Sequence, residues 1–188
     1  NLTMLFTEVP FLDRFALAAQ AGAHEIEFLF PYEYQPGQLA EQLQRYGLKQ
    51  VLFNLPAGDW AAGERGIAAN PAKVDEFRAG VQRALEYATV LQVPTLNCLA
   101  GLALPEVDAG EQRRTLVENI RFAATACEQR KVRLVVEGIN HLDMKGFNLN
   151  TAAQVLSVLD EVGHANAFLQ YDLFHACREE EDIPAVLT

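Results

Sequence analysis

The chain has 188 residues, half of them hydrophobic, which is enough to bury the core of one folded domain. Its formal net charge of −10 would repel nucleic-acid phosphates, so we expect no nucleic-acid partner. The three cysteines, Cys98, Cys127 and Cys177, are too widely spaced to suggest a disulfide framework or a zinc cluster, and they fit a reducing cytoplasm. With no leader and no apolar run near the roughly 18 residues that span a bilayer, we expect a soluble protein without a membrane partner.

Segments with the patterns of strands and helices alternate along the whole chain. Six strands are predicted, over residues 2–6, 24–30, 49–54, 95–99, 133–137 and 167–172. Apolar residues at helical spacing predict helices around residues 11–19, 77–88, 116–127 and 155–162. The run 134–136 is continuously apolar, which is typical of a strand that is buried on both faces of a parallel sheet.

Glycines and one capping pattern mark the predicted helix ends. Gly22, Gly47 and Gly163 each stand where a helix should stop before the next strand, in a conformation that glycine adopts most easily. Thr151 with Gln154 three residues later predicts a capping box at the start of the helix that ends at Gly163.

Repeated strand–helix units leave two main architectures, an open doubly wound sheet or a closed (β/α)8 TIM barrel. Residues 4–10 lack the glycine-rich fingerprint of a dinucleotide-binding sheet. Polar residues stand at the predicted carboxyl ends of strands, where a barrel places functional groups. They are Glu27, Asn54, Asn97, Glu137 and Asp172. We therefore predict α/β barrel architecture for residues 1–188 as a single domain. Because a barrel needs eight strands, we expect either that the last two strand–helix units are missing or that the architecture differs.

Two neighbouring predicted strands each end in an acidic residue. Glu137 comes directly after an apolar run, where a charge is costly unless a cation or a donor pairs with it. Asp172 ends the next strand in the same way, and oxygen ligands suit a hard divalent ion such as Mg²⁺ or Mn²⁺. A structural ion pair would produce the same pattern. His175 follows three residues later and either joins this site or only caps the next turn.

The connection over residues 55–66 is long enough for a lid or a binding loop, and it carries Trp60, the only tryptophan. A tryptophan packed back on its own barrel is the alternative. His141 and Lys145 either meet an anionic substrate or are surface charges. The acidic run 178–182 is most simply a solvated face that starts a helix.

Five segments together resemble one known family. They are residues 1–6, 25–32, 54–66, 137–141 and 170–175, and they are similar to hydroxypyruvate isomerases, which include the 2-oxo-tetronate isomerases and lie within the xylose isomerase-like TIM barrels. The loop with the core Trp-Ala-Ala-Gly-Glu-Arg-Gly is the most specific of these motifs. After His175 the chain departs from the family's usual Gln-Arg-Met-type segment.

The resemblance implies an aldose–ketose-type isomerase that interconverts hydroxypyruvate and tartronate semialdehyde through a metal-stabilised enediolate. It implies that Glu137 is a catalytic residue and a ligand of Mg²⁺ or Mn²⁺, that Asp172 is a second ligand, and that His175 contacts substrate oxygens. We also expect Asn54, Trp60, Arg65 and His141 to bind substrate. The family takes further ligands, including a second catalytic glutamate, from its last two strands, so we expect little turnover by the 188 residues alone.

Three alternatives remain at this point. The same site could isomerise a 2-oxo-tetronate, which the sequence does not separate from hydroxypyruvate. An abasic-site DNA nuclease would need a basic face and several histidine ligands, whereas this chain is acidic and has few histidines, four in all. A sugar-acid binding module without catalysis is the third alternative, and a homo-oligomer is compatible with all of them.

Overall fold

The computed structural model describes residues 1–187, and in these residues five strands form one parallel sheet. The strands are β1 (Glu25–Glu27), β2 (Lys49–Asn54), β3 (Thr95–Cys98), β4 (Arg133–Glu137) and β5 (Ala167–Gln170). The α-helices are α1 (Arg14–Gln20), α2 (Pro36–Tyr46), α3 (Val74–Leu91), α4 (Ala109–Gln129), α5 (Ala152–Val162), α6 (Leu173–Arg178) and α7 (Ile183–Val186), with short 3-10 turns at Phe11–Asp13 and Pro71–Lys73.

The order of the strands decides between the two architectures. Each strand pairs with its predecessor in the chain, in the order β1-β2-β3-β4-β5. A doubly wound sheet would reverse this order at a switch point, whereas a barrel keeps it. The register also aligns the strand ends, because Asn54 lies opposite Asn97 and Glu137 lies opposite Gln170. The predicted barrel-type α/β architecture is therefore confirmed.

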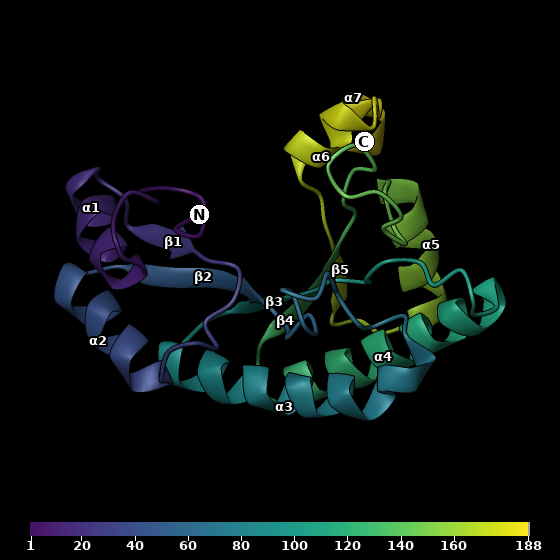
Figure 1. Cartoon of the computed structure of the whole chain (residues 1–188), viewed down its shortest axis with the longest axis horizontal. Helices are drawn as coiled ribbons and strands as arrows, with labels where there is room; N and C mark the ends of the chain where they lie inside the picture. The colour runs from purple at the N-terminus through teal and green to yellow at the C-terminus, as the bar shows by residue number, and fades with distance from the viewer. Residues whose placement is uncertain (188) are drawn as a thin grey trace.

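The helices cover one side of the strands. In Figure 1, α2, α3, α4 and α5 follow one another along the outer side of the sheet, and α6 and α7 stand beyond the end of β5. The core between these layers is aliphatic and aromatic, and its fully buried members include Leu39 of α2, Val81 of α3, Ile120 of α4 and Phe53 of β2. This layer packs along the strands, whose carboxyl ends face a cavity.

The predicted helix ends are confirmed. Gly47 and Gly163 end α2 and α5 with φ of 63° and 60°, in the left-handed region. Thr151 and Gln154 form both bonds of the predicted capping box at the start of α5.

The predicted strand over residues 2–6 is wrong. Only Leu2 reaches the sheet, where its N–H donates to the Glu27 carbonyl at 2.8 Å. The Asn1 carbonyl accepts the N–H groups of Met4 and Leu5, and the Asn1 side chain accepts that of Thr3. This local turn competes successfully with strand pairing, as asparagine side chains commonly allow. The predicted strands 24–30 and 167–172 are also shorter in the structure, as β1 and β5.

The acidic run after α6 is not simply a solvated face, so that interpretation is wrong in part. Glu181 accepts the N–H of Ala152 at 2.8 Å and so caps α5, and the Glu179 carboxylate bonds to His141. Asp182 starts α7 by accepting the N–H of Ala185. Among residues 1–187, none of the helices combines the length and the apolar composition that crossing a membrane requires.

Two glycines join the long loop after β2 to the loop after β3. Gly66 has φ of +124° and Gly101 has φ of +98°, and their backbones touch so closely that a Cβ on Gly101 would overlap the Gly66 carbonyl oxygen. A hydrogen bond from the Ala69 N–H to the Ala100 carbonyl, 3.0 Å long, closes the same junction. The loop that carries Trp60 is thereby anchored at its far end.

Replacing Gly101 with alanine is expected to lower the free energy of unfolding by about 2–4 kcal/mol, because the new Cβ would meet backbone atoms that cannot move independently. Urea denaturation measures the change. Gly37→Ala is the matched control, since a Cβ there meets open space, and it should change stability by no more than about 1 kcal/mol. Equal stabilities of the two variants would contradict the close contact.

Candidate functional site

A cavity of about 280 Å³ opens at the carboxyl ends of the strands. Its polar lining comes mainly from residues at or just beyond strand ends, namely Asn1, Glu27, Asn54, Glu137, Asp143, Gln170, Asp172 and His175. Its apolar lining includes Phe28, Leu29, Trp60, Leu99 and Met144. Four carboxylates therefore face this cavity, and within residues 1–187 its lining contains neither lysine nor arginine.

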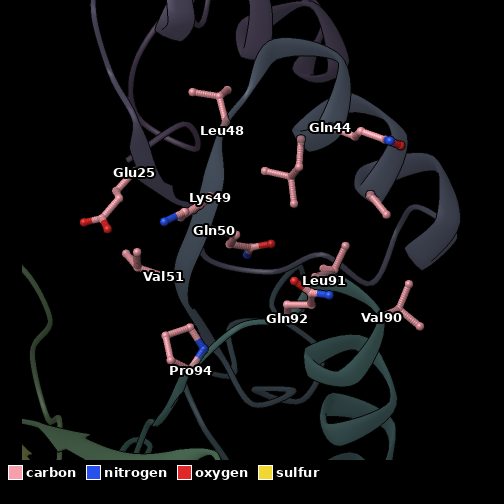
Figure 2. Close-up of a pocket in the computed structure, with 12 residues that line it drawn as sticks. Glu25, Gln44, Leu48, Lys49, Gln50, Val51, Val90, Leu91, Gln92 and Pro94 are labelled. Atoms are coloured by element: carbon pink, nitrogen blue, oxygen red, sulfur yellow. The ribbon is translucent and has the colours of Figure 1, made fainter.

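A larger groove of about 540 Å³ lies at the other end of the strands, between β2 and the ends of α2 and α3 (Figure 2). Its apolar lining includes Leu43, Leu48 and Leu91, and the side chain of the buried Gln50 also lines it. In the described chain, Glu25 is the one carboxylate in this lining, and no histidine is present. Chemistry that needs several ionisable groups is therefore favoured at the carboxyl-end cavity.

Glu137 is the most buried charged group of the cavity, with 7% of its surface exposed. It ends β4, and its Oε2 accepts a hydrogen bond of 2.9 Å from the side-chain amide of Asn97 on β3. The same amide nitrogen also donates to the Asn54 side chain on β2, at 3.0 Å. Three neighbouring strands thus hold the carboxylate in one orientation.

The environment of Glu137 raises its pKa to about 7. Burial is the largest cause, because it removes water from the charged form, and the negative charges of Asp172 and Glu27 act in the same direction. Hydrogen bonds from Asn97 and Gln170 oppose the shift, since they stabilise the carboxylate. A carboxyl group with this pKa can both hold and release a proton near neutral pH.

Asp172 and His175 join Glu137 from the next strand–helix unit. Asp172 follows β5 and caps α6, because its Oδ1 accepts the N–H of Phe174 at 2.7 Å. His175 lies in the first turn of α6. One donor atom each from Glu137, Asp172 and His175 lie within 4.8 Å of one another, which is close enough to surround a metal ion.

His175 is held by the loop after β4. Its Nδ1 lies 2.7 Å from the side-chain nitrogen of Asn140 and 3.3 Å from the Asn140 backbone nitrogen. Burial lowers the pKa of His175, although the charges of Asp172 and Asp143 oppose that effect. The neutral imidazole is therefore favoured in the folded protein.

The other predicted substrate-binding residues divide into two groups. Asn54 and Trp60 line the cavity, and the Trp60 ring packs against Phe30 with 5.1 Å between ring centroids. Arg65 and His141 lie outside the cavity lining. The guanidinium carbon of Arg65 lies over the Trp60 ring, 4.3 Å from the ring centroid. Nδ1 of the exposed His141 lies 2.7 Å from the Glu179 carboxylate. Binding roles for all four residues stay predictions.

Several polar residues of the site are absent from the predicted set. Gln170 was detectable, because it stands two residues before Asp172 and so shares its side of an extended segment. Asn97 stood out only as a strand-end polar residue, and its bond to Glu137 needs the sheet register. Asn140 and Asp143 lie in a loop whose path no periodicity predicts.

Comparison with known proteins gives consistent matches. A family model described as "Xylose isomerase-like TIM barrel" matches residues 15–187. The chain is 44% identical over 188 residues to the hydroxypyruvate isomerase of Escherichia coli (strain K12), covering all of this chain and 73% of that protein. It is also 44% identical over 183 residues to the 2-oxo-tetronate isomerase of Cupriavidus necator, covering 97% and 70% of the two chains.

Solved structures agree with this fold. A crystal structure named AP endonuclease, family 2, from Brucella melitensis superposes with a TM-score of 0.96 at 39% identity, over all of this chain and 72% of that one. A D-psicose 3-epimerase from Clostridium cellulolyticum H10 superposes with a TM-score of 0.74 at 18% identity, over 94% and 63% of the two chains. The second likeness concerns the fold alone.

Glu137→Gln is expected to stabilise the metal-free protein at slightly alkaline pH by about 1–3 kcal/mol, because it removes a buried charge that Asp172 and Glu27 repel. Below the ordinary pKa of glutamate the gain should vanish, since the wild-type carboxyl group is then neutral in both states. Chemical denaturation with a chelator present measures the difference. Glu118→Gln, at an exposed position of α4, is the control and should change stability by less than about 0.5 kcal/mol. If Glu137→Gln were less stable than the wild type, the Glu137 carboxylate would already be balanced by its neighbours, contrary to this expectation.

Proposed function

The chain belongs to the xylose isomerase-like TIM barrel family, and from this we propose that it is an isomerase that interconverts hydroxypyruvate and tartronate semialdehyde. The observation that carries the proposal is the meeting of Glu137, Asp172 and His175 at one cavity on the carboxyl ends of the strands. The 44% identity to a hydroxypyruvate isomerase, over every residue of the chain, supports the same reaction. The cytoplasm remains the compartment we expect.

We propose that Glu137 and Asp172 hold a divalent cation, Mg²⁺ or Mn²⁺. The donor set fits such an ion, because carboxylate oxygens are the ligands that these hard cations prefer. The cavity also requires a positive charge: four carboxylates line it without a lysine or arginine among the described residues, and the proposed substrate is itself a carboxylate. When bound, the ion would supply Lewis-acid stabilisation to negative charge on the substrate oxygens.

The side chains of the cavity divide the remaining work. The reaction moves one proton between adjacent carbon atoms through an enediolate, and Glu137 is the group placed to remove it. Asn97 keeps the Glu137 carboxylate in one orientation through its bond to Oε2. His175 is placed to contact a substrate oxygen, while Trp60, Phe28 and Leu29 restrict the access of water.

A second substrate is favoured by a specific observation, the equal 44% identity to a 2-oxo-tetronate isomerase. The same proton transfer would then act on a four-carbon oxo-acid. Abasic-site cleavage, the activity named for the Brucella structure, is less well supported. The net charge of −10 opposes DNA binding, and His175 is the one histidine that the described residues bring to the cavity.

Asp172→Asn is expected to weaken Mn²⁺ binding by more than the roughly 10- to 100-fold that loss of an outer-shell partner costs, because it removes a charged ligand. Asparagine caps helices as well as aspartate does, so α6 should stay intact. Isothermal titration calorimetry measures the affinity. Asp160→Asn on the exposed face of α5 serves as the control. Unchanged affinity in Asp172→Asn would remove Asp172 from the metal site.

Glu137→Gln is expected to lower kcat for hydroxypyruvate isomerisation by at least about 10²–10⁴-fold, the usual contribution of one acid–base group. The assay follows hydroxypyruvate conversion with Mn²⁺ in the protein as it is naturally expressed, and circular dichroism checks the folding of each variant. Comparing kcat/KM for hydroxypyruvate and a 2-oxo-tetronate identifies the preferred substrate. Near-native turnover by folded Glu137→Gln would refute the assigned role.

A further inference from the structure

We propose that Asn140 is a positioning residue that holds His175 as the neutral imidazole with its proton on Nε2. His175 then meets the cavity as a hydrogen-bond donor and is not a metal ligand, although it lies within reach of the other two candidate ligands. The substrate oxygen that would accept this hydrogen bond rests on the proposed isomerase function. The tautomer itself does not, because it follows from contacts within the protein.

The first step is the state of Nδ1. Two donors of Asn140 point at this atom, the side-chain NH₂ at 2.7 Å and the backbone N–H at 3.3 Å. Neither group can accept a hydrogen bond, so Nδ1 has to be the acceptor and cannot carry a proton. In a neutral imidazole the proton is then on Nε2.

The second step is the orientation of the Asn140 side chain, since exchanging its oxygen and nitrogen would reverse the argument. Asn140 is completely buried, and its oxygen accepts the Asp143 backbone N–H at 2.9 Å. Arg178 Nε also donates to that oxygen, at 3.3 Å. The nitrogen donates to the Asp143 carboxylate at 2.9 Å. A flipped amide would lose all three bonds, because its nitrogen would then face two N–H donors and its oxygen would face the Asp143 carboxylate.

The third step concerns metal binding. A histidine coordinates a metal ion through a nitrogen lone pair. The Nδ1 lone pair is occupied by Asn140, and Nε2 carries the proton, so neither nitrogen offers a free lone pair. The geometric cluster of three donor atoms therefore reduces to the two carboxylates, Glu137 and Asp172.

The surrounding contacts keep α6 in place for this bond. Arg178 of α6 forms an ion pair of 2.9 Å with Asp143, and Glu179, directly after α6, bonds to His141. The loop segment 140–143 is therefore tied to α6 and to the residue that follows it. Burial, which lowers the pKa of His175, acts in the same direction by disfavouring a doubly protonated ring.

The test is the tautomer of His175, read from two-bond ¹H–¹⁵N correlation spectra of ¹⁵N-histidine-labelled protein in a chelator at neutral pH. The signal that disappears in His175→Gln identifies the residue. We expect an unprotonated Nδ1 and a protonated Nε2, and the same pattern after saturation with Mg²⁺. A wild-type His175 with its proton on Nδ1, or one that loses the Nε2 proton on adding Mg²⁺, would overturn the proposal.

Asn140→Asp tests the cause. An aspartate at this position offers Nδ1 an acceptor in place of the side-chain NH₂ donor, so Nδ1 should become protonated. The value of kcat/KM should fall roughly 10- to 100-fold, the usual cost of losing the hydrogen-bond partner that orients a functional histidine. Asn70→Asp is the matched control. Its side chain only accepts a bond, from the Ala72 N–H, so aspartate adds the same charge without changing His175. A folded Asn140→Asp in which Nδ1 stays unprotonated would show that Asn140 does not set the tautomer.

Failure of the proposed function has a different signature. If the protein does not isomerise either oxo-acid but His175 shows the expected tautomer and the expected response to Asn140→Asp, the positioning role stands and the assigned reaction fails. If the protein isomerises an oxo-acid while His175 carries its proton on Nδ1, the assigned reaction stands and the positioning role of Asn140 fails.

Discussion

The buried carboxylate of Glu137 is the constraint on which the rest of the site depends. It lies at the end of an apolar strand, where an unbalanced charge is costly, and nearby Asp172 and Glu27 increase that cost. The side-chain amide of Asn97 partly offsets this cost by donating hydrogen bonds to Glu137 and Asn54, and these bonds link β2, β3 and β4 at their carboxyl ends. The features that make the site costly to fold are therefore the same ones on which the proposed cation binding and proton transfer rest.

Around this charge the two loops that frame the cavity are held by different means. The loop with Trp60 is anchored by the backbone contact between Gly66 and Gly101, and its Glu64 forms an ion pair of 2.7 Å with Lys73. The loop after β4 is held through the side chains of Asn140 and Asp143, which bind α6. The histidine on α6 therefore depends on a network rather than on the sheet.

Much of the fold was predictable from the chain alone. Continuous apolar runs located β2 and β4 with their observed bounds, and Gly47, Gly163 and the Thr151–Gln154 pair located helix ends. These signals are local, because they depend on side-chain periodicity and on backbone conformation within a few residues. Local signals were not sufficient for residues 2–6, where the predicted strand was wrong. A turn around Asn1 competes there with strand pairing, and only the tertiary context decides between them.

The sequence by itself determined that Glu137 and Asp172 follow apolar runs, and the family resemblance implied that they bind a metal ion. Only the tertiary structure decided which groups meet them. The register of β3 against β4 brings Asn97 to Glu137, and the path of a loop without periodicity brings Asn140 to His175. Both contacts join residues at least 35 positions apart. The physical reason is that local patterns specify elements, whereas hydrogen bonds between distant side chains arise only when packing sets the elements side by side.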